Sequence, residues 1–82
     1  MRVKIDKWVG PYKVYAEDML DGKRIYLNMR WWEPGSSLER SPAMERTVYL
    51  KNDPETVHEL DIHLDSIVRH FMEAVEERWG TV

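Results

Sequence analysis

The chain of 82 residues contains no cysteine. This absence excludes disulfide bonds and thiolate metal sites, and it is compatible with a reducing compartment. The sequence also lacks any apolar run near the roughly 18 residues that a membrane-spanning helix needs. The first residues, MRVKIDKW, alternate in polarity instead of forming the apolar stretch of a signal peptide. We therefore expect a soluble, unprocessed protein of the cytoplasm.

The length leaves no room for a second hydrophobic core, so we treat residues 1–82 as one domain. A chain of this size buries only about 60–65% of the surface that it exposes when unfolded, and its stability margin is small. A homodimer is a reasonable expectation on length alone.

The sequence has no sign of a catalytic centre. It contains no GxSxG, P-loop or HExxH motif, and its serines have no evident histidine and aspartate beside them. We predict that the protein is not an enzyme and carries no cofactor.

Metal binding is not indicated either. His58, His63 and His70 fall in a predicted helix, where His63 and His70 are two turns, or about 10 Å, apart. Only Glu59 and His63 have the spacing of a chelating pair. We predict no metal site.

The net charge of −3 is unevenly distributed along the chain. Residues 1–51 carry ten Lys/Arg and seven Asp/Glu, whereas residues 52–82 carry two and eight. The two parts should therefore meet different electrostatic partners. The acidic part could contact a basic protein.

Four segments alternate between apolar and polar residues, as half-buried antiparallel strands do, at about residues 3–6, 13–17, 24–32 and 47–50. Gly10-Pro11 and Asp21-Gly22 are turn signals between them. The polar segment 33–45 predicts a long loop before the last strand.

The remainder of the chain predicts one long helix. Asp53 and Pro54 form an N-cap and first turn, and Gly80 stands where a C-terminal cap is expected. The apolar positions recur every three or four residues from Val57 to Trp79. Such a helix is about 37 Å long, whereas four strands span roughly 15–20 Å. We expect an α+β fold of order β-β-β-β-α, in which a second copy covers the end of the helix; the predicted dimer interface is Phe71, Met72, Val75 and Trp79.

Strand alternation separates the sheet into two faces. The helix should cover the apolar face, which contains Val3, Ile5, Val14, Ala16, Ile25, Leu27, Met29, Trp31, Val48 and Leu50. The opposite face combines rings with cations and has Glu17 as its main acidic member; it contains Lys4, Trp8, Lys13, Tyr15, Arg24, Tyr26, Asn28, Arg30, Trp32, Thr47 and Tyr49.

Interleaved rings and cations on an exposed sheet are typical of proteins that bind single-stranded nucleic acid, because rings stack on bases and cations follow the phosphates. The same composition also fits a second core or a protein interface, since aromatic residues favour strands and cross-strand pairs intrinsically.

The segment Leu27-Asn28-Met29-Arg30-Trp31-Trp32, followed by the turn Glu33-Pro34-Gly35, resembles the third-strand signature of the positive cofactor four family of transcriptional coactivators, which bind single-stranded DNA. The flanks agree in order and spacing: they are residues 13–18, the turn Gly22-Lys23, and the last strand 46–50 running into Asp53-Pro54-Glu55. The resemblance covers roughly residues 12–75.

The resemblance implies a dimer, joined through the helix and sheet edges, with a channel for single-stranded DNA. Arg30 and Trp32 match the family's DNA-contacting arginine and aromatic residue, and Lys23 and Arg46 match basic positions beside the channel. Two positions depart from the pattern, because Glu17 and Met19 stand where related proteins carry an arginine and an aromatic residue.

We therefore predict a homodimeric, largely sequence-independent single-stranded-DNA-binding protein that acts in transcription or replication. The predicted contacts are Trp8, Lys13, Tyr15, Lys23, Arg24, Tyr26, Arg30, Trp32 and Arg46. An RNA ligand is a variant of this interpretation. A protein-interaction module, docking a partner through the aromatic face or the acidic helix, is the alternative.

Overall fold

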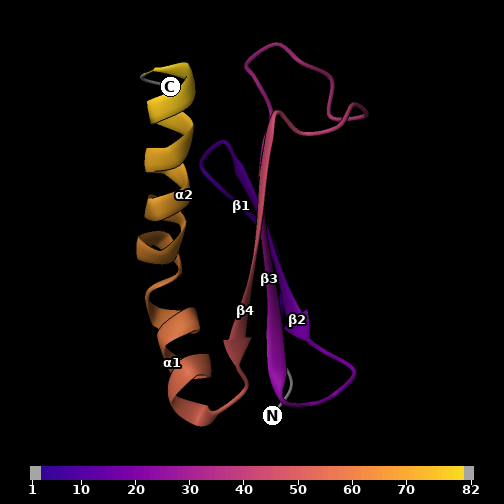
Figure 1. Cartoon of the computed structure of the whole chain (residues 1–82), viewed down its shortest axis with the longest axis vertical. Helices are drawn as coiled ribbons and strands as arrows, with labels where there is room; N and C mark the ends of the chain where they lie inside the picture. Colours follow the sequence, from indigo (N-terminus) through magenta and orange to yellow (C-terminus); the bar gives the residue numbers. More distant parts are fainter. Residues whose placement is uncertain (1–2, 81–82) are drawn as a thin grey trace.

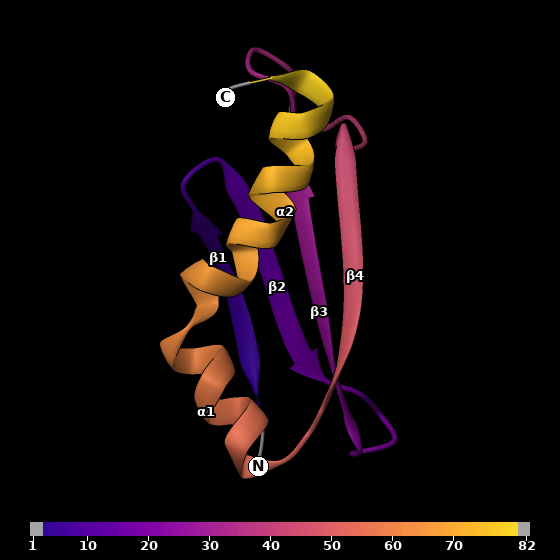
Figure 2. The ribbon, with the colours of Figure 1, turned by 60° about the vertical axis from the view of Figure 1, so that its left-hand side comes forward.

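The computed structural model describes residues 3–80, which form a four-stranded sheet with a layer of two helices on one face (Figures 1 and 2). The strands are antiparallel and neighbour one another in chain order; they are β1 (Lys4–Val9), β2 (Tyr12–Asp18), β3 (Arg24–Trp31) and β4 (Met44–Lys51). The helices are α1 (Pro54–Ile62) and α2 (Leu64–Trp79). The predicted α+β class and the antiparallel four-stranded sheet are confirmed.

The two hairpin turns lie where the sequence predicts them. Gly10 and Gly22 adopt φ of 59° and 67°, a region that glycine enters without steric cost. At the second turn, the Asp21 carboxylate accepts a hydrogen bond from the Lys23 backbone N–H at 3.0 Å. These turns fix the strand register and with it the separation of the two faces.

The core lies between the sheet and the helices. Trp31 is only 1% exposed, as alternation along β3 predicts. Tyr12, which the sequence analysis left outside the core, is also 1% exposed and packs edge-on against Phe71, with ring centroids 5.6 Å apart. Burial raises the pKa of the Tyr12 phenol. Tyr12 pairs with Trp31 across the two strands, so both rings cover the same end of the sheet.

The helical layer begins where Asp53 and Pro54 predict. The Asp53 side chain accepts a hydrogen bond from the Thr56 backbone N–H at 2.8 Å, and Pro54 occupies the first turn, where its missing N–H costs nothing.

The prediction of one uninterrupted helix is wrong, because the helix breaks at His63, whose φ and ψ are −112° and 24°. Neither glycine nor proline stands at the break. The segment Asp61-Ile62-His63 consists of residues with low helix propensity, and the change of direction keeps both Leu60 and Leu64 buried against the sheet. Neither helix among residues 3–80 is long and apolar enough to cross a bilayer.

The break also changes the argument for a dimer. Phe71 and Val75 are fully buried within the single chain, so they need no cover from a second copy. The sequence analysis compared the length of the helix with the width of the sheet. This comparison does not apply, because the helices run along the length of the strands instead of across them (Figure 2). Of the four predicted interface residues, only Met72 and Trp79 keep part of their surface exposed.

Candidate nucleic-acid interface

The face of the sheet turned away from the helices carries seven of the nine predicted contacts. The strand register arranges this surface in rows that cross the sheet, such as Trp8, Lys13, Arg30 and Glu45. We call it the open face; it consists of Lys4, Asp6, Trp8, Lys13, Tyr15, Glu17, Arg24, Tyr26, Asn28, Arg30, Trp32, Glu45, Thr47, Tyr49 and Lys51.

The aromatic residues of the open face form two groups. Trp8 and Trp32 meet at one end with ring centroids 5.8 Å apart. Towards the other end, Tyr26 lies between Tyr15 and Tyr49, with centroid distances of 6.3 and 5.9 Å. Trp8 is 44% and Tyr49 is 54% exposed, so each group offers a ring to a ligand. Tyr49 was placed on this face by alternation but was left out of the predicted contacts.

Three cations of this region are held by carboxylates. Arg30 donates from Nε to Glu45 at 2.8 Å, Arg24 contacts Asp21 at 2.9 Å, and Lys13 is paired with Asp6. Sequence reasoning emphasised Glu17 and overlooked the other acids, although strand parity places both Asp6 and Glu45 on the open face.

These contacts shift the pKa values of two of the carboxyl groups, those of Asp6 and Asp21. The Lys13 ammonium holds the pKa of Asp6 below its ordinary value, mainly by hydrogen bonding and then by charge. The Lys23 backbone N–H and the Arg24 guanidinium do the same for Asp21. Conversely, a hydrogen bond to the Glu17 carboxylate raises the pKa of the Tyr15 phenol. The open face therefore presents its charges largely as internal pairs at neutral pH.

Glu45 also reaches the middle of the sheet. Asn28 is 1% exposed, and its Nδ2 donates to Glu45 Oε2 at 3.2 Å and to Thr47 Oγ1 at 3.0 Å. One carboxylate thus accepts hydrogen bonds from both Asn28 and Arg30 and orients the arginine side chain. The Asn28 Oδ1 atom is buried without a hydrogen-bond partner.

Two of the predicted cations lie away from the strands of the open face. Arg46 pairs with the core residue Met29, so strand parity places its side chain on the helix side of the sheet, away from the open face. Val48, two residues further along β4, is on the helix side by the same parity. Lys23 is exposed in the turn after β2.

The loop between β3 and β4 is held by two tryptophans, Trp32 at the end of the open face and Trp79 at the end of α2. Trp32 Nε1 donates to the Arg40 carbonyl at 2.9 Å, and Trp79 Nε1 donates to Glu33 Oε1 at 2.8 Å. A hollow of about 310 Å³ opens between them, lined in part by Arg40. Trp32 is thereby held half-buried at the end of the open face instead of projecting freely.

Within residues 3–80, no group of three or more histidine, aspartate and glutamate side chains is placed to hold a metal ion. Comparison of the chain with protein-family models, with curated proteins and with solved structures found no match.

Proposed function

We propose that the protein binds single-stranded nucleic acid, with DNA as the expected ligand, through the open face. The observation that carries this proposal is the presence of exposed rings in two groups on a sheet surface that the helices leave uncovered. Each unpaired base has a flat face that stacks on such a ring, and stacking contributes roughly 1–3 kcal/mol per base regardless of sequence. Duplex DNA hides those faces, which favours single strands.

Cations near the rings support the same ligand. Arg24 Cζ lies 5.4 Å from the Tyr49 ring centroid, and Lys13 Nζ lies 5.6 Å from that of Trp8. A strand stacked on Tyr49 or Trp8 therefore brings its phosphates beside a guanidinium or an ammonium group. Both cation–ring contacts join residues of adjacent strands, so the pairing of the strands sets the distance between cation and ring.

The internal ion pairs weaken but do not prevent phosphate binding. The side chains of Arg30 and Glu45 are 41% and 47% exposed, and ion pairs exposed to this extent contribute about 0–1 kcal/mol to stability. A phosphate can replace the carboxylate at that small cost. Because each replacement also releases an anionic side chain near the strand, we expect modest affinity and a modest dependence on salt.

The experiment is a set of binding curves at several salt concentrations for mixed-sequence single-stranded DNA, the matching RNA and the duplex. We expect single strands to bind better than the duplex, with a log–log salt slope of about −2 if three phosphates are engaged. Absence of binding to either single strand at about 100 μM and low salt would refute the proposal.

The pairing of three of the five open-face cations with carboxylates favours one alternative, a protein-interaction surface. Rings flanked by compensated ion pairs are also common in protein interfaces. A partner retained after nuclease treatment, and lost on substitution of the exposed Trp8 or Tyr49, would support this alternative over nucleic-acid binding.

The homodimer implied by the resemblance is a separate proposal. With Phe71 and Val75 internal, it would use Met72, Trp79 and Ile62, which is 55% exposed at the end of α1. Sedimentation equilibrium of the wild type and of Ile62→Glu tests it, since a dimer built on these side chains should dissociate in the variant.

A further inference from the structure

A second surface, distinct from the open face, lies along the free edge of β1. Within residues 3–80, β1 pairs with β2 alone and forms one edge of the sheet. The Val3 carbonyl accepts a hydrogen bond from the Asp18 N–H. Because hydrogen-bonded residues alternate along an antiparallel pair, residues 5, 7 and 9 also bond to β2. The backbone N–H and C=O groups of Lys4, Asp6 and Trp8 therefore point outwards. A further strand could bond to these groups.

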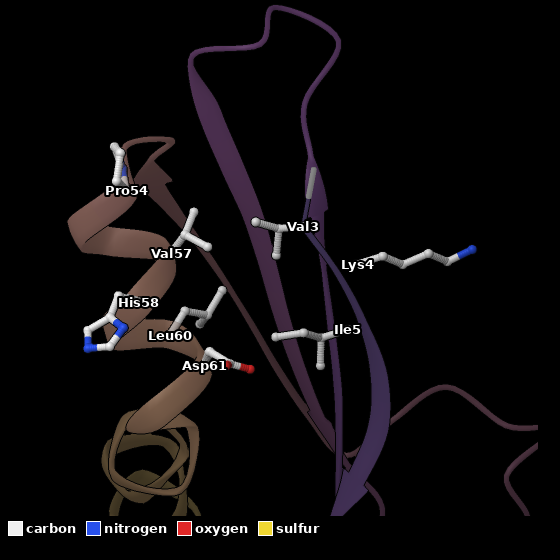
Figure 3. A pocket seen from close by; sticks show the side chains of 8 residues that line it. All are labelled: Val3, Lys4, Ile5, Pro54, Val57, His58, Leu60 and Asp61. Carbon is white, nitrogen blue, oxygen red and sulfur yellow. The ribbon is translucent and has the colours of Figure 1, made fainter. Parts of the chain in front are cut away.

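Beneath this edge the helical layer stands away from the sheet. A hollow of about 410 Å³ lies between β1 and α1, where Val3 and Ile5 project towards Val57 and Leu60 while Lys4 projects to the opposite side (Figure 3). An adjoining hollow of about 250 Å³ shares Ile5 and Leu60 with the first. A third, of about 440 Å³, lies farther along at Val9. A groove therefore accompanies β1 over its length. Its apolar lining is Val3, Ile5, Val9, Val57, Leu60, Leu64 and Met72, and most of its other lining residues are charged, Lys7 of β1 included.

The helix side of the groove is acidic. Among the helix residues that line these hollows, one cation, Arg69, faces four carboxylates, which are Asp61, Asp65, Glu73 and Glu76. A segment added to β1 would lie about 4.8 Å from it, with alternate side chains directed into the groove. Apolar side chains would fill the floor, and lysine or arginine at the ends would reach the acidic rim.

We propose that the β1 edge binds an extended, basic segment of a partner protein as a fifth strand. The charges on β1 itself, Lys4, Asp6 and Lys7, discourage indiscriminate pairing of the kind that exposed edges invite, so the pairing is selective. The proposal is independent of nucleic-acid binding, because the groove and the open face are on opposite sides of the sheet.

The probe is the blocked peptide Lys-Thr-Val-Thr-Val-Thr-Lys, whose alternate positions carry lysine and valine on one face. We expect it to slow hydrogen exchange of the Lys4, Asp6 and Trp8 amides at least about tenfold at saturation. The same peptide with glutamate in place of lysine should bind at least about tenfold more weakly.

Asp6→Pro and Asp6→Ala are a matched pair, because both remove the carboxylate but only proline removes the outward N–H. We expect peptide binding in the alanine variant and its loss in the proline variant. Asp61→Lys with Glu73→Lys should also weaken binding without touching the sheet, whereas Glu77→Lys, which does not line the groove, should leave it unchanged.

Three outcomes would overturn the proposal. The first is that the folded Asp6→Pro variant binds the lysine peptide as tightly as the Asp6→Ala variant does. The second is that the protein binds the lysine and glutamate peptides equally tightly. The third is protection of the β1 amides by self-association, seen as concentration-dependent sedimentation without peptide, which would assign the edge to a second copy of the chain.

Discussion

Glu45 holds Arg30 by a hydrogen bond of 2.8 Å on the surface that is proposed to bind nucleic acid. The carboxylate occupies the place that a phosphate oxygen would take, and it also anchors Asn28. Under the proposed function, the molecule thus contains its own competitor for Arg30, which matches the DNA-contacting arginine of the family that the sequence resembles.

Glu45→Gln should strengthen binding to single-stranded DNA. Glutamine keeps an oxygen that can accept from Asn28 and Arg30, but it removes the negative charge that repels phosphate. We expect a several-fold lower Kd at low salt, equivalent to about 1 kcal/mol, and a smaller gain at high salt. Glu39→Gln in the loop is the matched control; an equal gain there would mean that net charge alone, not the Arg30 contact, sets the affinity.

The adjacent tryptophans should separate folding from binding. Trp31 is buried beneath the helices with Trp79 5.1 Å away, so Trp31→Ala should cost about 3–5 kcal/mol of unfolding free energy. Trp32→Ala should lose less unfolding free energy, measured by urea denaturation, and more affinity for single-stranded DNA, measured by titration. Similar stability losses in both variants would contradict the separation of the two faces at the end of β3.

Tyr49→Ala should weaken DNA binding by about 1–3 kcal/mol if a base stacks on this ring. The ring is 54% exposed, and we expect little loss of stability because much of its surface is already in water. Fluorescence anisotropy of a labelled oligonucleotide measures the binding. Unchanged affinity in the folded variant would remove the tyrosine group from the site.

Asp53 predicts a pH dependence of stability. Hydrogen bonding from the Thr56 N–H lowers the pKa of Asp53 in the folded chain, so the unfolded chain binds the proton more readily. The stabilisation is present above the ordinary value of 3.8 and is lost as the pH falls through the lowered pKa. Thermal unfolding between about pH 2 and 6 should show the advantage of wild type over Asp53→Asn shrinking in acid; a constant difference would contradict this account.

Much of the sheet could be predicted because strand alternation and hairpin turns are local properties. Alternation along β3 placed Trp31 inside and Tyr26 outside, and Asp21-Gly22 marked the hairpin. The helix start followed from Asp53 and Pro54 for the same reason. The break at His63 could not be read from a glycine or proline, because it depends on how Leu60 and Leu64 both reach the sheet.

The ion pairs of the open face were not predicted, since most of them join residues distant in sequence. The pairing of Arg30 with Glu45 needs the register of β3 and β4 across a long loop. Strand parity alone places Arg46 on the helix side, whereas the resemblance matched it to a basic position beside the channel. Tyr12 was overlooked because the predicted strand began one residue later.

Arg30 and Arg46 provide the most direct test of nucleic-acid binding through the open face, because they are arginines on opposite sides of the same sheet. A labelled single-stranded oligonucleotide is titrated by fluorescence anisotropy with wild type, Arg30→Ala and Arg46→Ala. The account predicts at least about tenfold weaker binding for Arg30→Ala and less than about twofold change for Arg46→Ala. Equal losses in the two variants, or a larger loss in Arg46→Ala, would contradict it.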